Sequence, residues 1–215
     1  MKIAIVGGTG KEGRGLAVRW ARAGHQVAVG SRDAARAAEK GAELTALGFG
    51  TITGGGNAEV AAAAEVVLLS IPYAAHTETV KELREALQGK IVIDITVPVV
   101  PPKVSQVTLP AGQSAALEAQ EILGPGVRLC AGLHHISSVT LADPDHALEA
   151  DTLIVGDDPA AREVVIGLVG QLGLRGLDAG VLKNAIALES LTPVLLHMNK
   201  KYKGHAGVKI VGLGS

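Results

Sequence analysis

Three glycines at fixed spacing, Gly8, Gly10 and Gly13, are the residues of this chain with the clearest chemical use. They form the pattern G-x-G-x-x-G between an apolar run at 2–7 and a helix-like stretch at 12–24. There the first glycine permits a tight turn, the second lets the backbone approach a pyrophosphate, and the third lets helix and strand pack closely. The N–H groups at the helix N terminus then face the phosphates. The pattern predicts a dinucleotide-binding turn, with a purely structural glycine-rich turn as the alternative.

The end of the second apolar run indicates which dinucleotide binds. A carboxylate there would accept a hydrogen bond from the ribose 2′-OH of NAD and repel a 2′-phosphate. The chain instead has Ser31 and Arg32, followed about one helical turn later by Arg36. A hydroxyl and guanidinium groups suit a phosphate, so NADP is favoured over NAD. Two alternatives stay open: Ser31 as a helix N-cap beside a solvated Arg32, and Asp33 as the acid of an NAD site.

Proline follows two later apolar runs, at Ile71-Pro72 and at Val97-Pro98. Ligands of parallel sheets lie at the carboxyl ends of the strands. Because proline stiffens the chain and lacks an N–H donor, these segments suit a flat apolar wall against a nicotinamide. Plain turns are the alternative.

A third strand end carries His134 and His135. A histidine pair without a third ligand at suitable spacing makes a poor metal site, so no metal is expected. One of the two is predicted to hydrogen-bond a bound ring or carbonyl, with a structural role as the alternative.

Other reactive groups have simpler explanations. Cys130 lies inside an apolar run and is predicted to be an inert core residue. Asp157-Asp158 precedes Pro159, which fits a helix N-cap, and Asp94 is expected to make a structural hydrogen bond. The sequence contains neither G-x-S-x-G, H-E-x-x-H nor a P-loop motif. A dinucleotide site without a proton relay suits hydride transfer between two bound rings, with no acid or base residue required.

The elements that must position these residues alternate between short β-branched runs and alanine-rich amphipathic stretches. Strands are predicted at 2–7, 26–30, 65–71, 90–95, 127–133 and 152–156. Helices are predicted at 12–24, 33–47, 57–64, 74–88, 113–123, 159–172 and 181–201. This order predicts an α/β fold, a Rossmann-type doubly wound and mostly parallel sheet with a small C-terminal helical portion. We expect a dinucleotide-binding domain over 1–150 and a smaller portion over 151–215. Four prolines between 97 and 112 predict a loop there.

Composition excludes several classes of protein. The 215 residues carry 20 Lys+Arg and 21 Asp+Glu, so a general nucleic-acid binder and a polybasic membrane clamp are disfavoured. Aromatic residues are only 2%, which leaves few platforms for stacking bases. The single cysteine cannot form an internal disulfide, and no apolar segment reaches bilayer length. A cytoplasmic, soluble protein without nucleic-acid or membrane partners is expected.

Beyond these separate signals, the chain resembles the F420-dependent NADP oxidoreductase family. The similarity extends to Gly207-Val208-Lys209 at the C-terminal end. The motifs that carry it are Gly7-Gly8-Thr9-Gly10, Gly30-Ser31-Arg32, Ile71-Pro72, Val97-Pro98, Leu133-His134, Gly156-Asp157-Asp158, Leu177-Asp178-Ala179-Gly180 and Glu189-Ser190-Leu191-Thr192-Pro193. The stretches D-A-G and E-S-L-T-P are the most specific of these.

The resemblance implies hydride exchange between the nicotinamide C4 of NADP(H) and the deazaflavin C5 of coenzyme F420. It places Thr9 with Ser31 and the two arginines at the 2′-phosphate, the glycine turn at the pyrophosphate, and His134 with Ile136 at the deazaflavin. It also implies a homodimer and a pocket partly closed by the C-terminal helix. The cofactor-binding residues expected from both lines of reasoning are Gly8, Thr9, Gly10, Lys11, Glu12, Gly13, Ser31, Arg32, Arg36, Ile71, Pro72, Val97, Pro98, His134, Ile136 and Gly207.

The chain departs from the family pattern at three places. Ser137 replaces a familiar proline, Lys11-Glu12 replaces an Asn-Leu type pair, and Ala206 replaces a larger apolar residue. Two other functions are therefore kept as alternatives. One is an NADPH-dependent reductase of a flavin or of a small imine or carbonyl, and the other is a regulatory module that binds NADP(H) without turnover.

Overall fold

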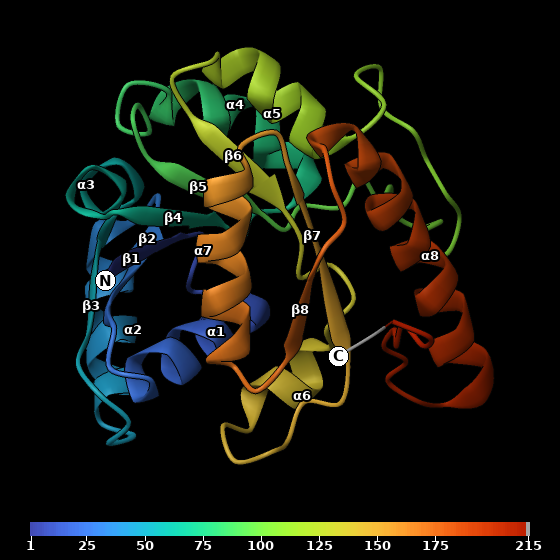
Figure 1. Ribbon diagram of the computed structural model, residues 1–215. Helices are drawn as coiled ribbons and strands as arrows, with labels where there is room; N and C mark the ends of the chain where they lie inside the picture. Colours follow the sequence, from blue (N-terminus) through green and yellow to red (C-terminus); the bar gives the residue numbers. More distant parts are fainter. Residues whose placement is uncertain (214–215) are drawn as a thin grey trace.

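A single twisted sheet forms the centre of the molecule (Figure 1). The computed structural model describes residues 1–213, and within them eight strands follow the order β3-β2-β1-β4-β5-β6-β7-β8. All neighbouring strands are parallel except β6 and β7, so the expected mostly parallel Rossmann-type sheet is confirmed. The strands are β1 (Lys2–Val6), β2 (Gln26–Ser31), β3 (Ile52–Gly56), β4 (Val66–Leu69), β5 (Ile91–Asp94), β6 (Arg128–Ala131), β7 (Asp151–Gly156) and β8 (Arg175–Asp178).

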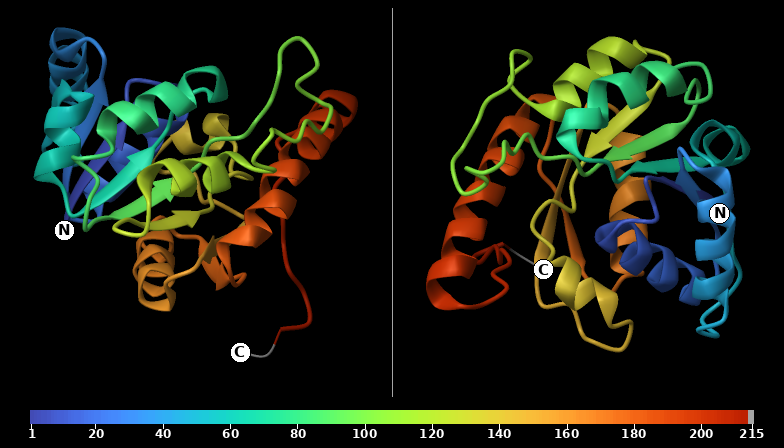
Figure 2. Two further views of the ribbon diagram at one scale, coloured as in Figure 1. Left: turned by 90° about the horizontal axis from the view of Figure 1, so that it is seen from above. Right: turned by 180° about the vertical axis from the view of Figure 1, so that it is seen from behind.

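Helices cover both faces of this sheet, as parallel strands with short connections require. One face packs against α1, α2 and α7, and the other against α3, α4, α5 and the beginning of α8 (Figures 1 and 2). The helices are α1 (Lys11–Arg22), α2 (Ala34–Thr45), α3 (Asn57–Ala63), α4 (Tyr73–Leu83), α5 (Ala115–Leu123), α6 (Ser138–Ala142), α7 (Pro159–Gly170), the short 3₁₀ helix η1 (Leu182–Asn184) and α8 (Ala185–Tyr202).

The central strand β1 shows why the core is divided in two. Ile3 and Ile5 point into the cluster under α1 and α7, while Ala4 and Val6 point into the cluster under α3 and α4. Side chains alternate between the two faces of a strand, so a strand covered on both faces is apolar at every inward position. The fully buried Trp20 of α1 donates its indole N–H to the carbonyl oxygen of Leu168 in α7 and joins these two helices.

Three elements were absent from the sequence-based prediction, namely β3, β8 and α6. The strand β3 reads Ile-Thr-Gly-Gly-Gly, and glycine is a poor strand former, so its sequence carries no strand signal. Its glycines permit close packing: a Cβ on Gly54 would lie 1.9 Å from the carbonyl oxygen of Ala37 in α2. The other two elements are four and five residues long, too short for a periodic pattern.

The C-terminal part of the chain first extends the sheet and then leaves it. Residues 151–178 contribute β7 and β8, and α8 stands beside that edge of the sheet (Figure 1). The predicted helix over 181–201 is in fact η1 followed by α8. The predicted loop over 97–112 is confirmed and runs out toward α8 (Figure 2). Among residues 1–213, no helix combines the length and the hydropathy needed to cross a bilayer.

Candidate functional site

The glycine turn joins β1 to α1 at the carboxyl edge of the sheet. Gly7 has a φ of 71°, a left-handed conformation that glycine adopts without strain. The N–H of Gly8 donates to the carbonyl oxygens of Ile5 and Gly30, which holds the turn against β2. Helix α1 then begins with Gly10 as its N-cap and without a capping side chain. Its first N–H groups are therefore available to an anion.

The three motif glycines differ in the space around them. A Cβ on Gly8 would lie 2.7 Å from the carbonyl oxygen of Ile5, and one on Gly13 would lie 2.7 Å from the Cα of Gly8. Both positions therefore serve packing between strand and helix. A Cβ on Gly10 would meet only the carbonyl oxygen of Gly7, at 3.5 Å, and Gly10 is exposed. The open position is the one predicted to let a phosphate approach the backbone, with Thr9, Lys11 and Glu12 beside it.

The predicted 2′-phosphate residues lie at the end of the neighbouring strand β2. Ser31 is half-buried as the last residue of β2, and Arg32 and Arg36 are exposed. The carboxylate of Asp33 accepts a hydrogen bond from the Arg36 N–H at 3.0 Å and so caps α2. Ser31 is therefore not the N-cap; its hydroxyl oxygen accepts from the Asp33 N–H at 3.2 Å. With Asp33 engaged by its helix, a hydroxyl and two cationic side chains remain around the site.

The two proline turns lie at the same edge of the sheet, after β4 and β5. Ile71 contacts the glycine turn directly, because a Cβ on Gly7 would lie 2.8 Å from the Ile71 Cγ2. Pro72 is the N-cap residue of α4. The second turn is tied to the first by the Thr96 hydroxyl, which donates to the carbonyl oxygen of Ile71 at 3.4 Å. The turn containing Val97 and Pro98 therefore adjoins Ile71.

The histidine pair after β6 separates into two roles. The imidazole of His135 is bound to the carbonyl oxygen of Leu188 in α8 at 2.7 Å, which is a structural contact. His134 is 9% exposed, and neither of its ring nitrogens has a hydrogen-bond partner within residues 1–213. Burial, and secondarily the neighbouring His135, lowers the pKa of His134 to about 3, so the ring is neutral at physiological pH. A neutral imidazole can donate from one nitrogen and accept at the other, but both nitrogens of His134 are shielded, and His134 is not among the residues that line the neighbouring cavity.

A cavity of about 710 Å³ lies beyond this pair and brings Gly207 together with Ile136 and Ser137, from which it is far apart in sequence. Three carboxylates, Asp143, Asp145 and Glu149, give one side of it an acidic character. The remaining lining residues are His135, Thr140, His146, Ala147, Leu148, Ala150 and His205.

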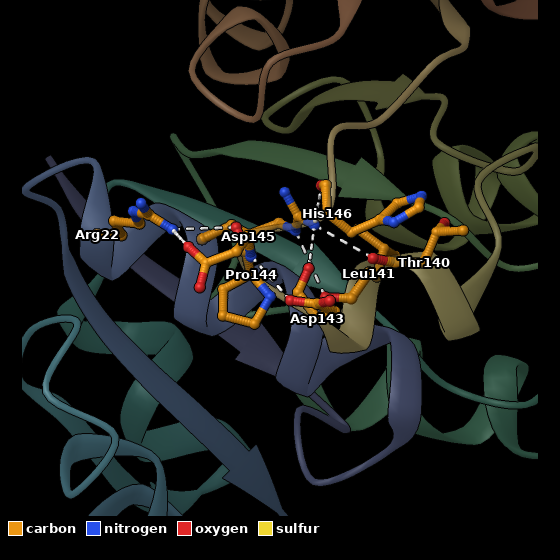
Figure 3. A network of polar contacts seen from close by, with 8 residues as sticks. Arg22, Thr140, Leu141, Asp143, Pro144, Asp145 and His146 are labelled. Atoms are coloured by element: carbon orange, nitrogen blue, oxygen red, sulfur yellow. Dashed lines mark hydrogen bonds and ion pairs between the residues drawn. The ribbon is translucent and has the colours of Figure 1, made fainter.

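The wall of this cavity is anchored to the helix that begins at the glycine turn (Figure 3). Arg19 of α1 donates hydrogen bonds to the carbonyl oxygens of Thr140, Leu141, Asp143 and His146. Burial lowers the pKa of Arg19, but these four acceptors supply partners for its Nε and one of its terminal nitrogens. A separate, exposed ion pair joins Arg22 to Asp145 at 2.6 Å. Helix α1 therefore connects the glycine turn to the distal cavity through the hydrogen bonds of Arg19.

Arg19 belongs to a group of residues that motif analysis did not identify. Its partners are more than 120 positions away, so no local pattern reveals them. The pairing of His76 was not predicted either: its imidazole is bound to the Asp94 carboxylate, 18 positions away, at 2.7 Å in the core. The partners of Glu189 were also not predicted: its carboxyl group accepts hydrogen bonds from the N–H groups of Ala115 and Ala116 at the start of α5. Glu189 lies in the E-S-L-T-P stretch, which was the available signal.

Three minor predictions can be compared with the structure. Cys130 is buried, and burial raises the pKa of its thiol to about 12, as an inert core residue requires. Asp158 caps α7 ahead of Pro159, and Asp157 accepts a hydrogen bond from the Leu182 N–H. Asp94 makes the predicted structural hydrogen bonds, with His76 and with the Thr96 N–H.

Comparison with known proteins adds independent information. The family described as "NADP oxidoreductase coenzyme F420-dependent" matches residues 2–98. An F420-dependent NADP reductase of Methanothermobacter marburgensis is 37% identical over 99% of both chains, and one of Methanocaldococcus jannaschii is also 37% identical over 99% of both. A crystal structure from Arthrobacter sp. FB24, provisionally assigned as an F420-dependent NADP reductase, covers 99% of this chain and 100% of its own, with a TM-score of 0.81 and 26% identity.

Proposed function

This chain belongs to the coenzyme F420-dependent NADP oxidoreductase family, and from that premise we propose that it transfers a hydride between NADP(H) and coenzyme F420. The observation that carries the proposal is the 37% identity to F420-dependent NADP reductases, which extends over almost the whole of both chains. Similarity of this extent includes the acceptor region as well as the dinucleotide turn. It favours F420 over a flavin or a small imine or carbonyl, and an oxidoreductase over a non-catalytic NADP(H)-binding module.

The dinucleotide would lie across the carboxyl edge of β1, β2 and β4. Gly10 leaves the room that a pyrophosphate needs, and the uncapped N terminus of α1 supplies N–H donors. Thr9 of the turn, together with Ser31, Arg32 and Arg36, would hold the 2′-phosphate. Because Asp33 is engaged as a helix cap, its carboxylate is less able to select NAD.

The nicotinamide end would lie along the proline turns. Ile71 and Pro72 on one side, with Val97 and Pro98 on the other, offer apolar surface and lack N–H donors at both prolines. Such walls exclude water from the reacting carbon, which protects a hydride donor.

The acceptor ring would lie beside His134 and Ile136, with Gly207 at the far side of the cavity. The free nitrogens of His134 fit the polar edge of a deazaflavin, since a bound ring could give them the partners they lack within residues 1–213. When bound, the two cofactors supply the chemistry as hydride donor and hydride acceptor. The protein aligns them, and no acid or base residue of the chain is assigned to the step.

In this arrangement the two parts of the chain would have different roles. Residues 1–150 would bind the dinucleotide, and residues 151–215 would complete the acceptor pocket. We also propose a homodimer formed through α8, because Val194, Met198 and Tyr202 leave 45%, 40% and 69% of their surface exposed on that helix. The cytoplasm is the proposed location, because F420 and NADPH are intracellular cofactors.

A mixing experiment tests the proposed activity. Oxidised F420 and NADPH are combined with the purified protein, and the visible absorbance of F420 is followed. Bleaching that depends on the protein is expected. Consumption of NADPH with a flavin but not with F420 would support the flavin reductase, and tight NADPH binding without any acceptor would support the regulatory module.

A further inference from the structure

A histidine and an aspartate form a hydrogen-bonded pair in the core, close to the turns of the proposed nicotinamide site. The side chains of His76 in α4 and Asp94 at the end of β5 are both 0% exposed, and the imidazole Nε2 lies 2.7 Å from a carboxylate oxygen. Burial lowers the pKa of His76, but the Asp94 charge and hydrogen bond outweigh it and raise it overall. The ring donates its Nε2–H to the carboxylate, while its Nδ1 is buried without a partner within residues 1–213.

Stability alone does not explain this pair. Replacing a buried ion pair by well-packed apolar side chains is often neutral or stabilising, because two charges must be taken out of water. The surroundings combine the apolar cluster under α3, α4 and α5 with Tyr73, which stacks on the His76 ring, and with the carboxyl groups of Glu118 and Glu189. The pair therefore invites an explanation in terms of positioning.

The contacts of Asp94 indicate what the pair positions. One carboxylate oxygen binds His76, on the first turn of α4, and the other accepts from the N–H of Thr96 at 2.9 Å. The Thr96 hydroxyl in turn donates to the carbonyl oxygen of Ile71 at 3.4 Å. A single carboxylate thus joins the segment that begins α4 to the segment that follows β5.

These two segments contain the prolines of the proposed nicotinamide wall. Pro72 and Pro98 have no N–H groups, so neither turn can be fixed by a hydrogen bond donated from its proline. Their neighbours must hold them instead, and Asp94 contacts a neighbour of each: His76 four residues after Pro72, and Thr96 two residues before Pro98.

We propose that the His76–Asp94 pair holds the two proline turns at the spacing required for the nicotinamide ring. His76 and Asp94 are then positioning residues for hydride transfer. This inference rests on the proposed function for the identity of the ring. Hydride transfer depends steeply on the geometry of donor and acceptor, and a displacement of about 1 Å can cost about 100-fold in rate. The adenosine end, at Ser31 and Arg32, makes no contact with the pair and should be unaffected.

The test compares the wild type with His76→Gln and Asp94→Asn. Asp94→Asn keeps the shape of the side chain and an oxygen for the Thr96 N–H, so it preserves folding better than removal of the carboxyl group. His25→Gln is the matched control, because His25 lies at the opposite, amino-terminal edge of the sheet, next to Gln171. The probes are NADPH and 2′-phospho-ADP-ribose, which lacks the nicotinamide.

The expected result is a loss confined to the nicotinamide. The affinity for 2′-phospho-ADP-ribose stays unchanged, while the extra affinity of NADPH over this fragment falls in both pair variants and not in His25→Gln. The single-turnover rate of F420 reduction falls by about tenfold or more. Equal affinity ratios in all four proteins, or failure of both pair variants to fold, would overturn the positioning role. If the wild type did not reduce F420, the proposed function would fail, but the affinity ratios would still decide whether the pair positions the nicotinamide.

Discussion

The two ends of the proposed site are built in opposite ways. At the phosphate end, the turn from Gly7 to Gly13 and the end of β2 present backbone groups and exposed cationic side chains from two neighbouring strand ends. At the acceptor end, the polar groups are buried, and they come from elements scattered over the chain: His134 after β6, His76 in α4 and Glu189 in α8.

This difference has a physical origin. Phosphates are charged and hydrated, and a helix N terminus with a few flexible cations binds them without burying charge. A neutral ring at a hydride-transfer site needs dry, rigid surroundings, and rigidity in a core requires polar groups that are fixed by partners. Substitutions that meet open space at the phosphate end should therefore alter NADPH affinity, whereas those at the acceptor end should alter F420 affinity, turnover, pH dependence or stability, according to the contacts that are lost.

The largest expected effect separates two glycines of one motif. Gly10→Val should lower the affinity for NADPH by about 100-fold or more. The valine side chain would displace charge-assisted hydrogen bonds worth about 1.5–3 kcal/mol each. The fold should persist, since Gly10 has an extended backbone (φ −73°, ψ 174°) and open space around it. Calorimetric titration and thermal unfolding measure both quantities.

Gly13→Val is the matched variant. Its Cβ would lie 2.7 Å from the Cα of Gly8, so it should lower the free energy of unfolding by about 1–3 kcal/mol through overpacking. If Gly10→Val retained NADPH affinity while remaining folded, the phosphate turn would be wrongly placed.

Arg32→Ala should weaken NADPH binding by about 1.5–3 kcal/mol, the typical worth of a hydrogen bond to a charged group. The affinity for NADH should change little, because NADH lacks the 2′-phosphate. Titrations of both cofactors against wild type and variant give the comparison. An equal loss for NADH and NADPH would remove Arg32 from the 2′-phosphate site.

Glu189 makes the acceptor end sensitive to pH. Burial raises the pKa of its carboxyl to about 8, against 4.5 for the unfolded chain. Between these values the folded protein holds a proton that the unfolded chain has released. Stability should therefore fall as the pH rises through this window, by up to about 1.4 kcal/mol per pH unit, and this contribution should level off above the folded pKa.

Urea unfolding of wild type and Glu189→Gln between about pH 6 and pH 9 measures this slope. The variant should lack the pH-dependent loss of stability that Glu189 causes. As the pH rises, the free energy of unfolding of the wild type should therefore fall relative to that of the variant. A difference that stays constant over this range would show that Glu189 titrates normally.

The smallest effect concerns His134. His134→Leu should leave the melting temperature and the NADPH affinity unchanged, because the ring nitrogens have no partners to lose within the described residues. The affinity for F420 should fall by about fivefold to tenfold, the worth of about one hydrogen bond. His135→Leu, which removes the bond to Leu188, should instead lower the melting temperature.

The sequence predicted most of the fold because its strands are apolar at nearly every position and its helices carry clear periodicity. It missed β3, whose Gly54 and Gly55 fit against helices but carry no strand propensity. The turn between β1 and α1 was predictable because its glycine pattern is local in sequence, whereas the role of Arg32 at the 2′-phosphate stays a prediction. The bonds of Arg19 and the pairing of His76 with Asp94 were not, because they join elements whose adjacency only the completed sheet determines.

The most direct test of the central claim is the fate of a labelled hydrogen. NADPH carrying deuterium at the transferred position of C4 is mixed with oxidised F420 and the protein, and the reduced F420 is examined by NMR spectroscopy. Direct transfer between adjacent rings predicts that deuterium appears at C5 of the deazaflavin. Reduced F420 that contains only solvent hydrogen at C5 would contradict a site that holds the two rings together and excludes water.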